Sequence, residues 1–296
     1  MTRPTATLIG FSAVALWALL AFFTVGSAPV PPFLLNALCF AIGGTAGLAW
    51  LLATGGLGRL TGIPLRVYAF GTAGLFGYHF LYFSALRLAP PAEAGLIAYL
   101  WPLFIVLGSG LLPGERLRAG HVLGAFLAFA GAALIVAGGI GRIEGATAGY
   151  ALAFVAALTW TAYSLGSRRL GHVPTAAVVV FCLASSVLSV LAHLAFETPA
   201  WPQGALGWAA VVGLGLGPVG LAFFTWDIGV KKGDIQLLGT ASYAAPLLST
   251  LVLVAAGMAA ATLSLLLAAM LIAGGALLAA RAGRPARRRV TKPKDA

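Results

Sequence analysis

Charged residues are scarce in this chain. Only 8% of its 296 residues are Asp, Glu, Lys or Arg, whereas about 25% of the residues of a soluble domain are charged. Hydrophobic residues make up 60%, and the mean hydropathy is +1.00. A soluble fold could not present such a surface to water, but uncharged runs of about 20 residues are long enough to cross a bilayer. The composition therefore excludes a soluble protein and predicts an all-α membrane protein.

Cysteines are few and the common catalytic motifs are missing. Cys39 and Cys182 both lie within apolar segments, which is not the pattern of an extracellular disulfide framework. The sequence has no H-E-x-x-H, G-x-S-x-G or P-loop motif, and its four histidines lack the spacing of metal ligands. We therefore expect a protein that is not an enzyme and that uses no cofactor or metal. An intramembrane lipid-modifying enzyme stays open as a rival of another class.

Acidic residues are absent from the middle of the apolar runs. The seven acids lie near expected helix ends, in loops or in the C-terminal tail: Glu93, Glu115, Glu144, Glu197, Asp227, Asp234 and Asp295. Ion-driven pumps usually carry a carboxylate inside the membrane. The sequence therefore predicts that any transport is facilitative or weakly coupled, with His79 the one mid-membrane group that could take a proton.

Apolar segments of transmembrane length recur between breaks of Gly, Pro or charge. There are ten, at 6–26, 31–53, 67–87, 92–112, 119–138, 147–166, 174–196, 206–226, 234–256 and 261–280. With the N-terminus inside, 16 of the 18 Lys and Arg residues fall in cytoplasmic loops or the basic tail, and only Arg87 and Arg142 fall outside. This asymmetry predicts a multi-pass protein of a bacterial inner membrane with both termini in the cytoplasm. It also explains the net charge of +11 without nucleic-acid binding, because a basic tail is attracted to anionic lipid.

The two halves of the chain resemble each other. A shift of 143 residues aligns Trp17 with Trp160, Pro31 with Pro174 and Cys39 with Cys182, and a shift of 144 aligns Tyr99-x-x-Pro102 with Tyr243-x-x-Pro246. Each half holds five expected spans, an odd number, so the second half must begin on the opposite side of the membrane. The sequence predicts two inverted repeats, 1–146 and 147–281, followed by a basic tail, 282–296. Inverted repeats are typical of transporters whose substrate site lies at the midplane between the halves.

These features, together with Pro113-Gly-Glu115-Arg-Leu followed by Gly120 and Gly124, resemble the EamA-type proteins of the drug/metabolite transporter superfamily. The resemblance implies a small-molecule exporter that works by alternating access between its halves. The aromatic-rich third and fourth spans are similar to those of bacterial exporters of aromatic amino acids, which implies an amino acid as the substrate. The second half departs from the family pattern, because Ala259 stands where an acid would match Glu115.

The third span carries a cluster of polar tips in the stretch GYHFLYF, residues 77–83. The midpoint of the span is near Gly77, so His79 lies near the bilayer centre, where an ionisable residue by default marks a functional cavity. Histidine tolerates this depth because it is neutral near pH 7. His79 and Tyr82 share one helix face, with Tyr78 beside them. A histidine that only hydrogen-bonds between helices is the alternative. The comparable segment of the second half, 220–226, has no histidine.

The fourth and ninth spans each contain a proline near the middle. Pro102 and Pro246 each free a carbonyl four residues back, which lipid tolerates only where protein or a water-filled cavity satisfies it. These kinks predict the walls of a pathway, although two purely structural kinks would give the same pattern. Tyr99 and Trp101 are about 200° apart on a regular helix, so we expect only one of them to face the cavity unless a kink at Pro102 relaxes this geometry.

We therefore expect a central cavity between spans 1, 3, 4, 6, 8 and 9. The residues expected to contact the substrate are His79, Tyr82, Tyr78, Tyr99 and Trp101 from the first half and Trp160, Tyr163, Trp226, Ser242 and Tyr243 from the second. Trp17, Pro102 and Pro246 are expected at gates or kinks, although core packing would explain Trp17 and Trp160 equally well. The expected partners are an amino acid and the lipid bilayer, with a monomer favoured and a dimer possible. A multidrug exporter that attracts flat cationic or aromatic compounds by cation–π contacts is the alternative.

Overall fold

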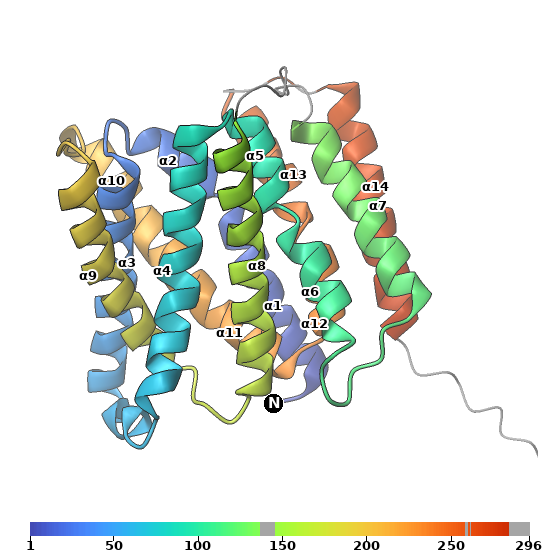
Figure 1. Ribbon diagram of the computed structural model, residues 1–296, viewed down its shortest axis with the longest axis horizontal. Coiled ribbons are helices and arrows are strands. Elements are labelled where there is room, and N and C mark those ends of the chain that lie inside the picture. The colour runs from blue at the N-terminus through green and yellow to red at the C-terminus, as the bar shows by residue number, and fades with distance from the viewer. Residues whose placement is uncertain (137–145, 258–259, 261, 284–296) are drawn as a thin grey trace, which may run out of the picture.

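The structure, a computed structural model, describes residues 1–136, 146–257, 260 and 262–283. Every regular element within these ranges is helical, and the helices run side by side as one bundle (Figure 1). The prediction of an all-α membrane protein is confirmed. The end of the fifth expected span at 138, Arg142, Glu144, Ala259 and most of the basic tail, 284–296, lie outside the described residues.

The helices follow the expected apolar segments closely. Their bounds are α1 Arg3–Trp17, α2 Leu20–Gly26, α3 Pro32–Ala53, η1 Gly56–Leu60, α4 Leu65–Leu88, α5 Pro91–Ala98, α6 Trp101–Ser109, α7 Ala119–Val136, α8 Thr147–Arg169, α9 Ala177–Phe196, α10 Gly204–Leu216, η3 Gly217–Leu221, α11 Ala222–Lys232, α12 Ile235–Ala241, α13 Ala244–Ala255 and α14 Leu263–Gly283. Each of the ten expected ranges overlaps at least one of these helices.

Seven helical stretches of the described chain are long and apolar enough to cross a membrane. They are Arg3–Gly26, Pro32–Ala53, Thr147–Arg169, Ala177–Phe196, Gly204–Lys232, Ile235–Ala255 and Leu263–Gly283. Two shorter apolar stretches are Glu93–Ser109 and Ala119–Ile135. Helix α4 is 24 residues long, but its tyrosines, histidine and glycines make it less hydropathic than these seven. The count of ten spans therefore stays a prediction.

Four helical stretches are interrupted near the centre of the bundle. The breaks fall between α1 and α2, between α5 and α6, between α12 and α13, and at the π-helical turn η3 between α10 and α11. A proline stands at or near three of these breaks: Pro102, Pro246 and Pro218. Proline interrupts a helix because it lacks the N–H that would continue the hydrogen-bond pattern. The break after Trp17 has no proline nearby.

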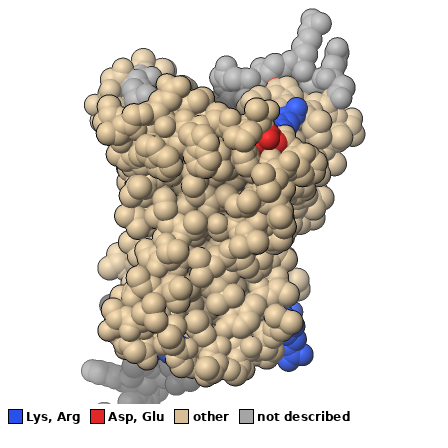
Figure 2. All heavy atoms as spheres, turned by 90° about the vertical axis from the view of Figure 1, so that its left-hand side faces the viewer, with Lys and Arg blue, Asp and Glu red and all other residues tan. Residues whose placement is uncertain are grey.

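Charged side chains lie at the two ends of the bundle. Figure 2 shows the face that α9, α10 and α3 form on the left of Figure 1, and it is free of charge except near its ends. At the end opposite the N-terminus, the buried carboxylate of Glu197 accepts hydrogen bonds from the backbone N–H groups of Phe33 (2.9 Å) and Leu34 (3.1 Å) at the start of α3. It also pairs with Arg87 at 2.5 Å and with His193 Nδ1 at 2.9 Å. The acid that directly follows α9 thus satisfies two of the free donors at the start of α3.

Helix pairs approach closely where glycines face one another. Helix α1 packs on α11 through Gly10 and Gly229, and a Cβ atom on Gly229 would lie 2.6 Å from the Cα atom of Gly10. Helices α7 and α14 meet in the same manner around Gly124, Gly131 and Gly275. Small residues are the usual means by which helices associate in lipid, where the solvent gives no hydrophobic driving force.

The contact between Gly10 and Gly229 gives a test of this packing. Gly229→Ala should destabilise the protein by about 1–3 kcal/mol, because the backbone of Gly10, 2.6 Å from the new methyl group, leaves no room for it. Thermal unfolding of the detergent-solubilised protein measures the loss. The matched control is Gly77→Ala, also inside a helix, where the new methyl group would meet only Thr159 at 3.6 Å. Equal stability of the two variants would contradict the packing described.

Candidate substrate-binding site

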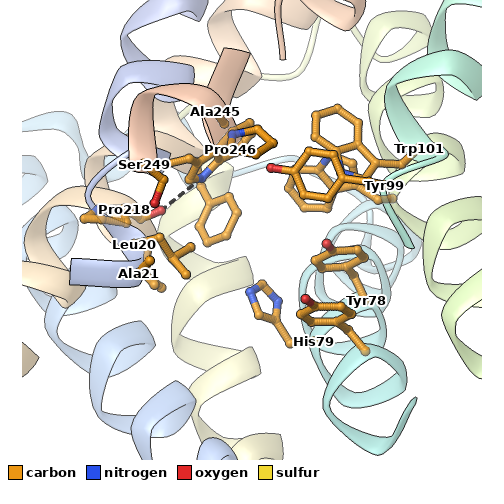
Figure 3. Close-up of a pocket in the computed structure, with 15 residues that line it drawn as sticks. Leu20, Ala21, Tyr78, His79, Tyr99, Trp101, Pro218, Ala245, Pro246 and Ser249 are labelled. Atoms are coloured by element: carbon orange, nitrogen blue, oxygen red, sulfur yellow. Dashed lines mark hydrogen bonds between the residues drawn. The ribbon is translucent and has the colours of Figure 1, made fainter. Parts of the chain in front are cut away.

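A pocket of about 210 Å³ lies at the centre of the bundle, where the interrupted helices meet. Its walls are formed by Trp17, Leu20, Ala21, Tyr78, His79, Tyr82, Tyr99, Trp101, Trp160, Pro218, Val219, Phe223, Ala245, Pro246 and Ser249 (Figure 3). None of these described lining residues is charged. The pocket is therefore neutral, rich in rings, and polar only through hydroxyl, indole and imidazole groups.

Indole rings form one side of the pocket. The ring centroids of Trp17, Trp101 and Trp160 are 6.0 to 6.1 Å apart, and each pair meets edge to face. Trp17 is fixed by a hydrogen bond of 3.1 Å from its Nε1 atom to the carbonyl oxygen of Pro218, drawn dashed in Figure 3. The Nε1 atom of Trp160 is buried and has no partner among the described residues. An indole N–H beside the pocket is thus available to an acceptor that enters it.

His79 is held in one orientation by its own helix. Its Nδ1 atom lies 2.7 Å from the carbonyl oxygen of Leu75. Because a carbonyl oxygen only accepts, Nδ1 carries the proton, and the Nε2 atom of the neutral ring is left with a lone pair. Nε2 has no protein partner in the described part of the chain. The ring itself packs edge-on against Phe40 and Phe223, at centroid distances of 5.2 and 6.0 Å.

Three tyrosines complete the polar side of the pocket. The rings of Tyr78 and Tyr82 are stacked 5.9 Å apart and are nearly parallel, at 7°. Tyr78 also packs on Trp160 at 5.3 Å. Figure 3 shows Tyr78, His79 and Tyr99 facing Leu20 and Pro218 across the hollow. The pocket thus has a polar aromatic wall and an opposite wall of small apolar groups.

Both Tyr99 and Trp101 line the pocket, although a regular helix would allow only one of them to do so. Helix α5 ends at Ala98 and α6 begins at Trp101, and the two residues between them close the last turn of α5. The interruption changes the direction of the side chains that follow it. The 200° separation holds for a regular helix only, and the interruption before Pro102 allows both rings to face the pocket.

The predicted site residues fall into two groups. His79, Tyr82, Tyr78, Tyr99, Trp101 and Trp160 line the pocket, as do Trp17 and Pro246 from the predicted gates and kinks. The others lie behind the walls: Tyr163, Trp226, Ser242, Tyr243 and Pro102. Trp226 packs on Trp17 at 5.1 Å, and Tyr163 on Trp160 at 5.2 Å. These residues support the pocket from outside and do not face it.

Tyr243 has a definite structural role. Its hydroxyl oxygen accepts a hydrogen bond of 3.0 Å from the backbone N–H of Leu103, in the first turn of α6. The first N–H groups of a helix have no partner within the helix, and the break before Trp101 buries this one inside the bundle. Tyr243 thus caps a helix of the other half of the chain.

Sequence reasoning missed several lining residues. They are Leu20, Ala21, Pro218, Val219, Phe223, Ala245 and Ser249. The repeat could have indicated Phe223, because it stands 144 residues after His79, the same shift that aligns the Tyr-x-x-Pro motifs. No such signal exists for Leu20 and Ala21, which reach the pocket because α1 and α2 are interrupted.

The pocket continues toward one end of the bundle. A second cavity of about 610 Å³ shares Leu20, Ala21, Tyr78, His79, Tyr82 and Val219 with it. This cavity extends past Thr24, Pro29 and Val30, between α2 and α3, at the end opposite the N-terminus (Figure 1). A solute could therefore reach the pocket from that end.

The other end of the bundle is closed. Below the indole rings, Trp226 is fully buried and donates a hydrogen bond of 3.2 Å to Ser164. Further on, the Glu115 carboxylate, only 5% exposed, pairs with Arg168 and with Arg3 at 3.1 Å. Arg168 also donates to the carbonyl oxygens of Val230, Lys231 and Gly233. This cluster joins the start of α1, the loop before α7, the end of α8 and the turn after α11.

Comparison with known proteins agrees with this architecture. Residues 4–137 match the EamA-like transporter family. The aromatic amino acid exporter YddG of Ancylobacter novellus is 55% identical over 283 residues, which cover 94% of this chain and 98% of that protein. The protein of the same name from Escherichia coli is 27% identical, with 94% and 97% covered. A solved crystal structure of a protein 54% identical to this chain superposes with a TM-score of 0.91, covering 96% of this chain and 100% of that one.

The membrane-capable helices and the transporter relatives together define the class of the protein. It is a multi-pass inner-membrane transporter and not an enzyme. The chain belongs to the EamA-like transporter family of the drug/metabolite transporter superfamily. Within that family it is similar to the YddG proteins.

The division between lining and supporting residues can be tested with two matched variants. Tyr243→Phe should lower the free energy of unfolding by about 1–3 kcal/mol, because the buried N–H of Leu103 loses its acceptor, and should leave ligand binding at the pocket unchanged. Tyr99→Phe should weaken ligand binding at the pocket and leave the free energy of unfolding unchanged. Thermal unfolding and equilibrium ligand binding on purified protein distinguish them. A loss of binding confined to the Tyr243 variant would contradict the assignment.

Proposed function

We propose that the protein exports aromatic and other neutral amino acids across the inner membrane by alternating access, facilitatively or with weak coupling. The observation that carries this proposal is the neutral pocket between His79, the three tyrosines and the indole rings. Two of its relatives are named as exporters of aromatic amino acids, one of them 55% identical over nearly the whole chain.

The pocket chemistry suits a zwitterion. An ammonium group can be held by the faces of the rings and by the His79 Nε2 lone pair. A carboxylate needs donors, and the unpartnered Nε1–H of Trp160 and the tyrosine hydroxyls provide them. An aromatic side chain can stack against the remaining rings. Because no described lining residue is charged, a solute with no net charge leaves no buried charge uncompensated.

A multidrug exporter of flat cations is the second candidate, and the same rings favour it. A cation, however, would enter a pocket whose described walls contain no carboxylate, so its charge would be balanced only by ring faces. An amino acid carries its own counter-charge. This difference favours the amino acid.

We propose ten spans in two inverted repeats, 1–146 and 147–281, with the basic tail from 282. The pairing of helices supports this, because a shift of one half onto the other exchanges the pairs α1–α11 and α8–α4 and leaves α3–α9 and α7–α14 unchanged. At residue level, Gly124 meets the carbonyl oxygen of Gly275, and the shift of 144 turns this contact into that of Gly131 with Ala268, which is also present.

We propose that both termini lie in the cytoplasm and that the protein acts as a monomer, with a dimer possible. The N-terminus and the C-terminal end of α8 lie at one end of the bundle (Figure 1). The ion pairs of Glu115 join Arg3 of α1 and Arg168 of α8 at this end, and loops rich in Lys and Arg are retained on the cytoplasmic side. The pocket then opens to the periplasm and is closed toward the cytoplasm by the Glu115 cluster. Loading from the cytoplasm requires that cluster to separate.

Flux through reconstituted vesicles tests the substrate and the site together. Labelled phenylalanine or tryptophan should exchange across vesicles that hold the purified protein, and His79→Ala or Tyr82→Ala should each lower the rate about tenfold or more, since each removes a polar contact to a charged group. Tyr243→Phe, behind the wall, is the control. Absence of exchange for every amino acid, with transport of an aromatic cation instead, would favour the multidrug function.

The closed end gives a second test. Glu115→Gln removes the carboxylate that holds Arg3 and Arg168, so the cytoplasmic side should open more often. Both native cysteines are buried, so labelling of a Ser164→Cys variant by a thiol reagent reports that opening. Labelling should become several times faster when Glu115→Gln is added and should not change with Arg66→Gln, an exposed basic residue at the same end. An unchanged rate in the Glu115 variant would remove the cluster from the gating step.

A further inference from the structure

A third hollow lies on the outside of the bundle and shares no residue with the central pocket or with the cavity that continues it. It is a groove of about 670 Å³ between α3, the first turns of α9, and the stretch from η3 to α11. Its walls include Gly43, Ala46, Gly47 and Trp50 of α3, together with Arg59 and Lys232. The export function proposed above makes no use of it.

The floor of the groove lies where two glycines allow α3 to pack closely against its neighbours. A Cβ atom on Gly43 would lie 2.6 Å from the Cα atom of Gly220, and one on Gly47 would lie 2.7 Å from the ring of Phe224. The π-helical turn η3 brings Gly220 and Leu221 to the same place. Close packing of α3 against the backbone of η3 and the ring of Phe224 therefore forms the floor of the hollow.

The groove faces the lipid. Ala46 is exposed, Trp50 is 56% exposed and Leu221 is 53% exposed, so its rim is apolar. From Leu216 to Lys232 it follows about 24 Å of helix, at about 1.5 Å per residue. It therefore runs from the middle of the bundle to the end that carries the N-terminus (Figure 1), roughly the depth of one leaflet and its interface.

The polar end of the groove carries two basic side chains. Arg59 and Lys232 line it, and neither forms an ion pair within the described residues. The Arg59 guanidinium lies over the Trp50 ring, 5.8 Å from its centroid. Asp227, which lies on α11 with Lys232, has a buried carboxylate that already accepts hydrogen bonds from Lys231 at 2.9 Å and Thr175 at 2.7 Å. None of the described lining residues is acidic.

We propose that this groove binds one anionic glycerophospholipid from the leaflet at the basic end. An acyl chain would lie over Gly43, Ala46 and Gly47, and the phosphate would lie between Arg59 and Lys232. An apolar channel that ends in two unpaired cations matches an amphiphile with an anionic head. A free phosphate would leave the channel uncovered, and a zwitterionic lipid would leave the cations without a net counter-charge.

The lipid site adjoins the substrate pocket. The turn η3 presents Pro218 and Val219 to the pocket and Gly220 and Leu221 to the groove. A lipid chain seated in the groove would therefore pack against the back of one pocket wall.

Photocrosslinking tests the site on the full-length protein. The protein is placed in phosphatidylcholine vesicles that contain a little phosphatidylglycerol with a photoreactive acyl chain, and the labelled residues are mapped. Labelling should concentrate on residues 43–50 and on α11, and unlabelled phosphatidylglycerol should compete at least about tenfold better than phosphatidylcholine. This expectation takes each surface Lys or Arg as about fivefold in affinity for anionic lipid.

Two pairs of variants separate charge from shape. Arg59→Gln combined with Lys232→Gln should abolish the preference for phosphatidylglycerol, whereas Arg66→Gln, exposed at the same end outside the groove, should retain it. Ala46→Phe should fill the channel and lower labelling by either lipid, whereas Ala49→Phe, exposed on the same helix, should not. Equal competition by both lipids, labelling spread evenly over the helices, or crosslinks to a second copy of the chain in the groove would each overturn the proposal.

Discussion

The structure depends on one constraint, which is that hydrocarbon cannot satisfy a free backbone N–H or C=O group. A helix that is interrupted inside the membrane must therefore have protein or a water-filled cavity beside the interruption. The breaks before Leu20, before Trp101 and before Ala244, together with the turn η3, all meet around the central pocket. Tyr243 supplies the acceptor that α6 lacks, and the carbonyl of Pro218 accepts from Trp17. The pocket and the broken helices thus require each other.

Charge is arranged by the same physics. The carboxylates that hold the bundle together lie at its ends, where Glu197 caps α3 and Glu115 joins four segments. Between them the pocket is held by ring contacts and neutral hydrogen bonds. An ion pair at the ends separates at lower cost than one at the centre, because water can reach the separated charges. This division leaves the centre free for a solute and makes the ends the natural place for opening and closing.

Much of the fold could be predicted from the sequence, because apolar runs and glycine-rich faces are local signals. His79 and Tyr78 could be predicted as pocket residues because their depth in a long apolar segment makes polar tips costly. The direction of residues after a break could not. After a break, the directions of the side chains no longer follow from the helical period of the segment before it. For this reason both Tyr99 and Trp101 face the pocket, whereas Tyr243 and Trp226 do not. Leu20 and Ala21 were missed because nothing local marks the end of α1. Phe223 could have been predicted from the internal repeat, which aligns it with His79.

That alignment of Phe223 with His79 gives the pocket a direction. The two rings stand at matching positions of two similar halves and meet edge to face, yet one offers a nitrogen lone pair and the other only carbon. A scaffold that is close to symmetric therefore encloses a binding surface that is not. A solute whose two ends differ in polarity therefore fits such a surface in one orientation, and turning it end for end would place its polar end against the ring of Phe223.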